Sequence, residues 1–531
     1  MKKILSILVL LAFMATVAPF AHADESLVGG DLVVGMNGTP YAMNGWTSND
    51  LNANLLADLL YPSLIKYDEN AVKVPNVIES YTYNDDASVW TITIHDGLFW
   101  HDGVEFTAED LAFTANFCAT YDVNFGSDYY FMVNEAVALD KLTVQYTLDD
   151  SYVNFINNCG YWVDVMPKHL FEGVEDLSTF EIPTIGYGPY KLDSYVHGEY
   201  YTFSRVPGYA LANDGVGGYA ETITFRVFAD ANALTLALMS GEIDCTSSAL
   251  PVSSQEQLLS QPDLYGMLQL QSLGYGYFGF SYRNPLLADN AVRRAISHTI
   301  DRNALVNIAI QGGGVVMETP ISPVYEDMTE GAAKFPAFDI EAAKEILEAA
   351  RYTDDGSGVR SNEAGDKLSF TLTCRNTTPN IDAISNIFKA NCAEAGIEAI
   401  INMVDPPTYT DKVVQSRDFD INYIEWGVID DPDTTLDAIY LSTATLNFMD
   451  FQNDAMDAIL LEVKYMTDRD ARVAKMFEFQ ELFVEELPTA NVLVRMNCYG
   501  YSTQKWEGFD GTPGLYGFTD SKDIVSIHLK K

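Results

Sequence analysis

The stretch WTITIHDGLFWHDGVEFTAEDL, residues 90–111, decides the local fold more clearly than any other part of this chain. In residues 90–94, apolar side chains alternate with threonines, and a period of two predicts a strand with one buried face. Asp-Gly pairs follow at 96–97 and 102–103. Each pair suits a tight turn, because glycine adopts a positive φ angle without a steric cost.

The end of the same stretch carries the signals of a helix start. Thr107 is suited to the N-cap position, and Asp110, three residues later, stands where a capping box has its acid. Leu111 and Phe113 begin an apolar face. The pattern therefore predicts a strand, a turn, a short strand, a second turn and a helix.

These residues resemble a signature of the family 5 extracellular solute-binding proteins, which serve ABC importers for peptides, nickel complexes and some sugars. The resemblance is carried by YPSL at 61–64, FWHDG at 99–103 and FTAEDL at 106–111. Further stretches are similar to the family's motifs: MPKHL at 166–170, GYGPYKL at 186–192, SGEID at 240–244 and NPLLADNAVRRAISHTIDRNALV at 284–306.

The resemblance implies an α/β protein with the two-lobed periplasmic-binding-protein fold, of class II and cluster C type, with an extra subdomain in the larger lobe. It implies crossings between the lobes at 273–275 and at Pro488. The expected division is a signal peptide at 1–23, lobe I at 24–57, 182–273 and 489–531, its subdomain at 58–181, and lobe II at 274–488.

The function implied is that of the substrate-binding component of an ABC import system. Such a protein captures a solute outside the cytoplasm, here most plainly a di- or oligopeptide, by hinge closure and delivers it to a permease and its ATPase. A monomer with no catalytic residues, no cofactor and no metal is expected. An oligosaccharide or nickel complex as ligand, and a sensor or peptide-chaperone role, stay open as alternatives.

A secreted hydrolase is the rival class, because abundant carboxylates and aromatic residues could suit glycoside cleavage. The acid pairs at 85–86 and 149–150, however, fall at predicted turns. The chain contains no G-x-S-x-G or H-E-x-x-H motif. The sequence therefore favours a binding protein over an enzyme.

The amino-terminal residues and the net charge indicate the location and the partners of the protein. Residues 1–23 combine two lysines, an apolar run and the A-x-A site Ala21-His22-Ala23, which predicts a signal peptide. No cysteine follows it, so a free periplasmic or secreted protein is expected rather than a lipid-anchored one. A formal charge of −44 argues against nucleic-acid and anionic-membrane partners.

Six widely spaced cysteines show no CxxC pattern, so neither a zinc site nor a redox motif is predicted. A disulfide between Cys118 and Cys159 and free buried thiols are both compatible with the spacing. His95 and His101 have no matched third ligand, which favours a structural role in the turns over a metal site.

Residues 367–433 read as a β-α-β unit followed by another strand. Strand patterns cover 368–372, 397–403 and 419–425, and a helical stripe covers 381–392. Ligands of open α/β sheets collect beyond the carboxyl ends of the strands. This rule selects Arg375, Asp405 and the loop 426–433 as candidate binding residues, from three strand ends.

The resemblance implies a role for each candidate. An arginine near Arg375 pairs with the ligand's carboxylate in peptide-binding members, and an acid in the loop that begins at Trp426 pairs with the amino terminus. Here the loop is shorter and has Ile429 at the place of that acid, so either Asp430 is displaced into the role or the amine site is absent. The alternative is a surface ion pair for Arg375 and a solvated turn for the acids of 430–433.

Three other patterns are interpreted as structural. Arg293 and Arg294, on an amphipathic helix pattern, are expected to form salt bridges. Residues 354–358 resemble a calcium loop but lack its alternating oxygen ligands, which favours a hairpin turn. The glycines of 312–314 lack the lysine of a P-loop and predict a plain loop.

Overall fold

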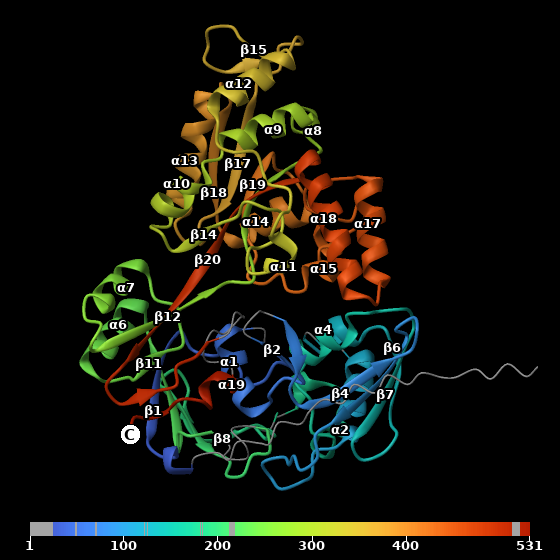
Figure 1. The fold of residues 1–531 in the computed structure, drawn as a ribbon, viewed down its shortest axis with the longest axis vertical. Coiled ribbons are helices and arrows are strands. Elements are labelled where there is room, and N and C mark those ends of the chain that lie inside the picture. Colours follow the sequence, from blue (N-terminus) through green and yellow to red (C-terminus); the bar gives the residue numbers. More distant parts are fainter. Residues whose placement is uncertain are drawn as a thin grey trace, which may run out of the picture.

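The computed structural model describes residues 25–47, 50–68, 72–121, 123–124, 126–180, 182, 184–211, 218–511 and 521–531. The predicted signal peptide, residues 1–23, lies outside these residues. The described chain forms two α/β parts, one above the other, connected by strands that pass between them (Figure 1). None of its described helices has the length and apolar character needed to span a membrane.

The stretch 90–111 belongs to a four-stranded antiparallel sheet at one side of the lower part (Figure 1). Trp90, Ile92 and Ile94 are buried on β5, as the alternation predicts. Strands and helices of this unit are β4 (Ile78–Tyr83), β5 (Val89–Ile94), β7 (Thr143–Leu148), β6 (Val133–Ala138), α2 (Ala108–Thr120), α3 (Gly126–Tyr130), α4 (Phe155–Trp162) and α5 (Lys168–Phe171).

The predicted turns and helix start are confirmed. Gly97 and Gly103 have φ angles of 84° and 91°. Thr107 caps α2, and both hydrogen bonds of the capping box with Asp110 are present. Asp110 also accepts a hydrogen bond from the backbone N–H of Lys168, at 3.0 Å, which connects the helix start to the next segment of the unit.

The rest of the lower part surrounds a sheet centred on β1 (Asp31–Asn37). β1 is parallel to both β10 (Thr222–Phe228) and β11 (Cys245–Thr246), and β10 continues antiparallel into β9 (Tyr200–Arg205) and β8 (Tyr190–Val196). The covering helices include α1 (Leu51–Leu60), α6 (Ala231–Ser240) and α7 (Val252–Leu259).

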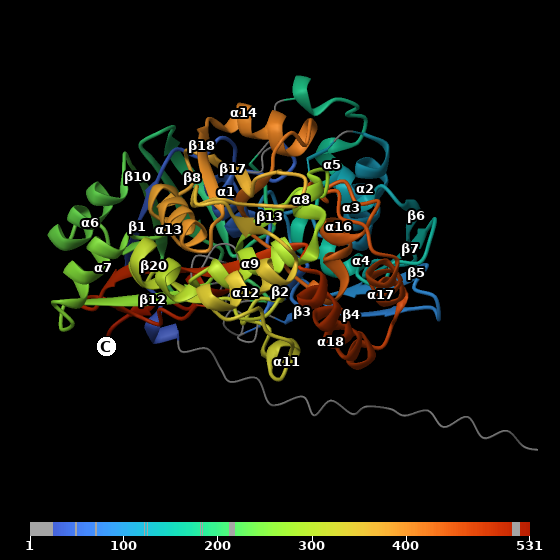
Figure 2. The same cartoon turned by 90° about the horizontal axis from the view of Figure 1, so that it is seen from above.

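The upper part contains the predicted β-α-β unit. β17 (Ser369–Arg375) is parallel to β18 (Glu398–Val404) and to β19 (Ile421–Glu425), and β19 is antiparallel to β13 (Gly276–Phe280). Its helices include α9 (Asn290–Thr299), α12 (Ile340–Ala349), α13 (Ile381–Glu394), α17 (Asp454–Tyr465) and α18 (Arg469–Glu486). Seen from above, α13 lies beside β17 and β18 (Figure 2).

One long strand, β20 (Thr489–Ser502), belongs to both parts (Figure 1). Its first residues pair with β13, and its residues from Met496 onward pair with β12 (Tyr265–Gln271). β20 itself therefore passes from one part to the other, and the crossing at Pro488 stays a prediction. The chain also passes between the parts in the segment that joins the end of β12 at Gln271 to the start of β13 at Gly276.

The predicted disulfide is not present, because Cys118 and Cys159 are both free and buried. Burial raises the pKa of the Cys118 thiol to about 12, so it stays protonated at neutral pH. The second alternative, free buried thiols, is the one that the structure supports. Residues 354–358 form the predicted hairpin, between β15 (Thr353–Asp354) and β16 (Arg360–Ser361).

The predicted salt bridges of Arg293 and Arg294 are wrong. Arg293 donates from Nη2 to the carbonyl of Glu486 at 2.7 Å, and Arg294 donates to the carbonyl of Glu485 at 3.0 Å. Both guanidinium groups thus satisfy carbonyls at the carboxyl end of α18, which have no partner within the helix. The physical reason is that carbonyl oxygens at a helix end compete with carboxylates for the N–H groups of an arginine.

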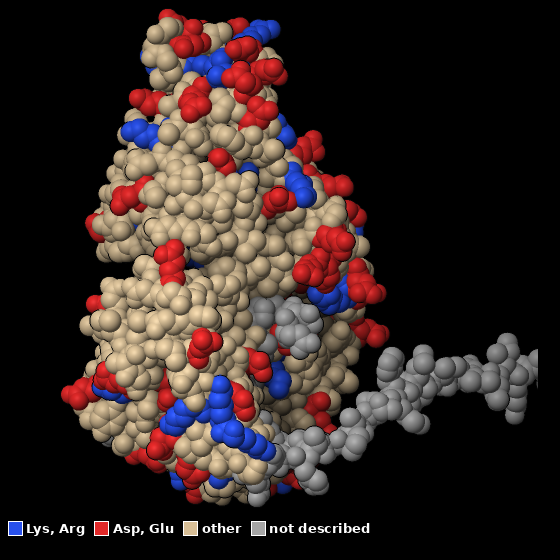
Figure 3. Space-filling view, turned by 60° about the vertical axis from the view of Figure 1, so that its left-hand side comes forward, with Lys and Arg blue, Asp and Glu red and all other residues tan. Residues whose placement is uncertain are grey.

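Acidic side chains are spread over both parts on the face shown in Figure 3, and a notch separates the two parts at one edge. On this face the acidic side chains are not gathered into one patch. An acidic exterior of this kind gives no information about the ligand, so the ligand must be inferred from the interior of the molecule.

Candidate functional site

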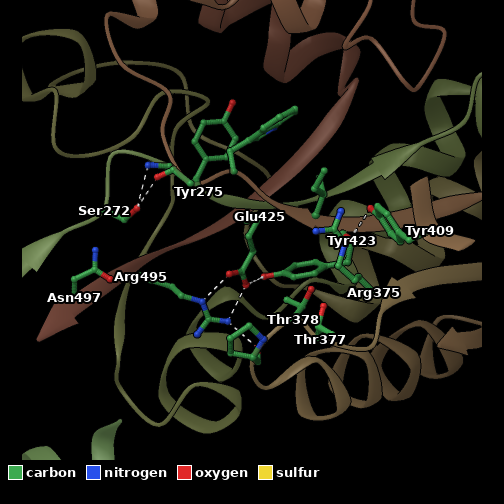
Figure 4. A pocket seen from close by; sticks show the side chains of 16 residues that line it. Ser272, Tyr275, Arg375, Thr377, Thr378, Tyr409, Tyr423, Glu425, Arg495 and Asn497 are labelled. Atoms are coloured by element: carbon green, nitrogen blue, oxygen red, sulfur yellow. Dashed lines mark hydrogen bonds and ion pairs between the residues drawn. The ribbon is translucent and has the colours of Figure 1, made fainter. Parts of the chain in front are cut away.

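A cavity of 320 Å³ lies where β17 and β19 end, beside the crossing strands. The carboxyl ends of these strands meet there, as the sheet rule predicts. Ser272 and Tyr275 reach it from the first crossing, and Arg495 and Asn497 reach it from β20 (Figure 4). The remaining lining residues are Gly274, Gly276, Arg375, Thr377, Thr378, Pro379, Tyr409, Tyr423, Ile424, Glu425, Trp426 and Gly427.

Arg375 is the last residue of β17, so the strand end holds its guanidinium at this cavity. The guanidinium carbon lies 5.1 Å from the ring centroid of Tyr409, a cation–π contact. Within the described part of the chain, its buried Nε has no hydrogen-bond partner and its guanidinium forms no ion pair. A half-buried guanidinium with an unpaired Nε is suited to an anionic ligand group.

Arg495, the second arginine of the cavity, is neutralised. Glu425 accepts from its Nε at 2.6 Å and from its Nη2 at 2.8 Å, and also accepts from the Tyr423 hydroxyl at 2.7 Å (Figure 4). Burial alone would lower the pKa of Arg495, but the pairing with Glu425 outweighs burial and raises it. One positive charge, that of Arg375, is therefore left over among the charged residues that line the cavity.

Trp426 lines this cavity and a second one, also of 320 Å³. Its ring stacks on Phe448 with centroids 6.2 Å apart. The second cavity lies between the two parts, because Tyr129, Tyr152 and Asn158 reach it from the lower part and its other lining residues belong to the upper part. These other residues are Val428, Ile429, Asp430, Thr434, Thr435, Asp437, Ala438, Ile439 and Leu446, together with Trp426.

Asp430 borders the second cavity and is buried, with 8 % of its surface exposed. Its carboxylate accepts from Nζ of Lys73 at 2.6 Å and from the hydroxyl of Tyr67 at 3.0 Å. Asp431 pairs with the same Nζ at 2.9 Å. The interpretation of these acids as a solvated turn is therefore wrong, because they form a buried ion cluster that connects the two parts.

The pKa values of this cluster reflect burial and attraction acting against each other. Burial alone would lower the pKa of Lys73, but the attraction of the two carboxylates outweighs burial and raises it. Burial would raise the pKa of Asp430, but Lys73 outweighs burial and lowers it. The Lys73–Asp430 pair is therefore ionised over a wide pH range.

Asp405 lies outside the lining of both cavities. It is the N-cap of the short helix α14 (Pro406–Tyr409) and accepts from the N–H of Thr408 at 3.0 Å and from its hydroxyl at 2.9 Å. These hydrogen bonds lower its pKa. The structure thus brings Arg375 and Trp426 together at one cavity, with Asp430 at the next, and leaves Asp405 apart.

Two residues of the site were missed from the sequence. No sequence pattern indicates Arg495, because its pairing with Glu425 depends on which strands become neighbours in the fold. Lys73 was also missed, although a lone lysine between apolar residues could have suggested a buried ion pair. His101, interpreted as structural, contacts backbone only: Gly186 donates to its Nδ1 at 3.2 Å, and its Nε2 lies 3.1 Å from the carbonyl oxygen of Gly188.

Comparison with known proteins matches residues 73–447 to the family model of bacterial extracellular solute-binding proteins, family 5. The oligopeptide-binding protein AppA of Bacillus subtilis is 27% identical over 492 residues, which cover 88% of this chain and 86% of AppA. The glutathione-binding protein GsiB of Pectobacterium atrosepticum is 21% identical over 505 residues, which cover 92% of this chain and 94% of GsiB.

Solved structures agree with the expected fold. The structure of AppA in complex with a nonapeptide superposes with a TM-score of 0.73 at 25% identity, over 95% of this chain and 99% of AppA. NikZ of Campylobacter jejuni, in complex with Ni(L-His), superposes with a TM-score of 0.74 at 20% identity, over 94% and 99%. The two-lobed periplasmic-binding-protein fold is confirmed, and the chain belongs to the bacterial extracellular solute-binding proteins of family 5.

Proposed function

We propose that this protein captures a peptide outside the cytoplasmic membrane and delivers it to the permease and ATPase of an ABC importer. One observation carries the choice of ligand: the guanidinium of Arg375 has no carboxylate partner among the described residues and lies at a cavity beside the crossing strands. A peptide's carboxylate supplies the missing partner and binds an arginine with two parallel hydrogen bonds.

The similarity to oligopeptide-binding AppA supports the same ligand class. The crossings within β20 and at residues 273–275 support a hinge between the lobes. A ligand that contacts both lobes favours the closed state. The protein acts as a monomer, without catalysis, after removal of the predicted signal peptide 1–23.

Isothermal titration calorimetry tests the proposal with three probes: a pool of tetrapeptides, a pool of oligosaccharides and nickel(II)–histidine. Binding of the peptides alone is expected. Mass spectrometry of the same mixtures is expected to show unchanged peptides. Binding of the sugars or the nickel complex in place of peptides, or formation of cleaved products, would contradict the proposal.

A further inference from the structure

The second cavity differs from the first in the state of its charges. Two charged side chains line it among the described residues, Asp430 and Asp437, and both have internal partners. Lys73 holds Asp430 at 2.6 Å, and Lys464 holds Asp437 at 3.0 Å. A cationic group that entered this cavity would therefore find both carboxylates already paired with an internal ammonium.

Lys73 is fixed more tightly than a surface lysine. Its side chain is 1 % exposed, and its ammonium lies 5.5 Å and 5.3 Å from the ring centroids of Tyr67 and Tyr161. Two carboxylates and two aromatic faces thus surround one ammonium. Displacing it would leave a buried lysine without a partner, which is strongly unfavourable.

A ligand ammonium could otherwise approach Asp430 with Lys73 in place. The two ammonium groups would then share one carboxylate and lie within a few ångströms of each other in a buried region. Like charges repel strongly there, because little water screens them. The cluster therefore offers no favourable site for a ligand ammonium at this end of the site.

The remaining walls of the second cavity are apolar or uncharged. Trp426, Val428, Ile429 and Leu446 provide the apolar surface, and Trp426 separates this space from the cavity at Arg375. A ligand that passes Trp426 would meet Arg375, which has no carboxylate partner among the described residues, on one side, and on the other side a pocket whose two carboxylates are already paired.

We infer that the site recognises its ligand by a carboxylate at Arg375 and does not recognise a free ammonium, because Lys73 takes the place of a ligand cation at Asp430 and Asp431. The ligand class is a peptide whose amino end either is not recognised by the protein or is blocked by an uncharged apolar group. The inference rests on the proposed function and adds the feature of the peptide on which selection acts.

The test divides one pool of random tetrapeptides into three portions: unmodified, N-acetylated and C-amidated. Native mass spectrometry measures how much of each portion the wild-type protein retains. We expect the unmodified and acetylated portions to be retained within about 3-fold of each other, and the amidated portion to be retained at least 10-fold less.

Retention of unmodified over acetylated peptides by 10-fold or more would overturn this inference and leave the proposed function intact. Equal retention of the amidated portion would overturn the role of Arg375 in selection. If no portion is retained, the proposed function itself fails, so the two failures are distinguishable.

Lys73→Met isolates the role of the internal ammonium. Asp430 and Asp431 would then lack their cation, and we expect the variant to retain unmodified over acetylated peptides by about 10-fold. A ratio that stays near one in the folded variant would overturn the role of Lys73. If the variant does not fold, the wild-type ratio still decides the inference.

Discussion

Residues 90–111 and the cavity at Arg375 differ in whether their charged side chains have internal hydrogen-bond partners. In the first region, Asp110 accepts from the backbone N–H groups of Thr107 and Lys168 at 2.9 and 3.0 Å, and His101 bonds the backbone of a glycine segment. In the second region, the guanidinium of Arg375 has no carboxylate partner within the described residues.

The difference separates residues that build the fold from residues that we propose bind the ligand. A side chain whose hydrogen bonds all go to backbone contributes to the free energy of folding and has nothing left for a ligand. A buried donor without a partner contributes little to folding and is available for binding. Substitutions in the two regions should therefore change different quantities.

Asp110→Ala should give the largest effect. It removes a carboxylate acceptor for two part-buried backbone N–H groups, and a hydrogen bond to a charged group contributes about 2 kcal/mol, so the free energy of unfolding should fall by about 4 kcal/mol. Denaturant unfolding measures the free energy of unfolding. Titration calorimetry of the folded variant is expected to show an unchanged peptide affinity. Glu109→Ala, at the exposed neighbouring position, is the control and should change neither.

Acid should destabilise the first region through His101. Burial lowers the pKa of His101 to about 4, below its unfolded value of about 6.5, so the unfolded chain binds more protons between these values. Stability should then fall by about 3 kcal/mol as the pH falls from 6.5 to 4.

His101→Gln, which does not titrate, should be less sensitive to pH in this window than the wild type. The measurement is the unfolding free energy of both proteins at pH 7 and pH 4.5. An identical pH dependence in the two proteins would mean that His101 is not the group responsible.

Arg375→Ala should weaken peptide binding by at least 10-fold, because a charge-assisted hydrogen-bonded pair contributes about 1.5–3 kcal/mol. Its Tm should stay within about 1 °C of the wild type, since no internal ion pair is lost. Titration calorimetry gives the affinity. Arg351→Ala, at an exposed arginine that pairs with Glu363, is the matched control. An unchanged affinity in Arg375→Ala would remove the carboxylate assignment.

Asp405→Ala should give the smallest effect. The aspartate caps a four-residue helix and is exposed, so its loss should lower the Tm by on the order of 1 °C. Peptide affinity should not change, because Asp405 does not line either cavity. A loss of affinity comparable to that of Arg375→Ala would place Asp405 in the binding site after all.

The parts of the fold that the sequence predicted are those in which neighbours along the chain interact. The alternation of 90–94, the turn glycines and the Thr107–Asp110 capping box all involve residues a few positions apart. The sequence also predicted that Arg375 and Trp426 lie close together, because the β-α-β pattern determines which strand ends are neighbours. The bounds of the two lobes stay a prediction.

The parts that it did not predict depend on distant neighbours. Lys73 and Asp430 are 357 positions apart, and Arg495 and Glu425 are 70 positions apart. Cys118 and Cys159 lie in one unit but are not bonded, because disulfide formation depends on distance and orientation and not on spacing in the chain.

By itself, the sequence determined the class of receptor and the local scaffold, because periodicity, turn residues and caps act over short distances along the chain. Only the tertiary structure decided which charges are left for the ligand. Packing of the two parts joins Lys73 to Asp430 and β20 brings Arg495 to Glu425, so that Arg375 is left without a carboxylate among the residues that the structure describes. Charge pairing depends on proximity in space, which the order of residues does not give.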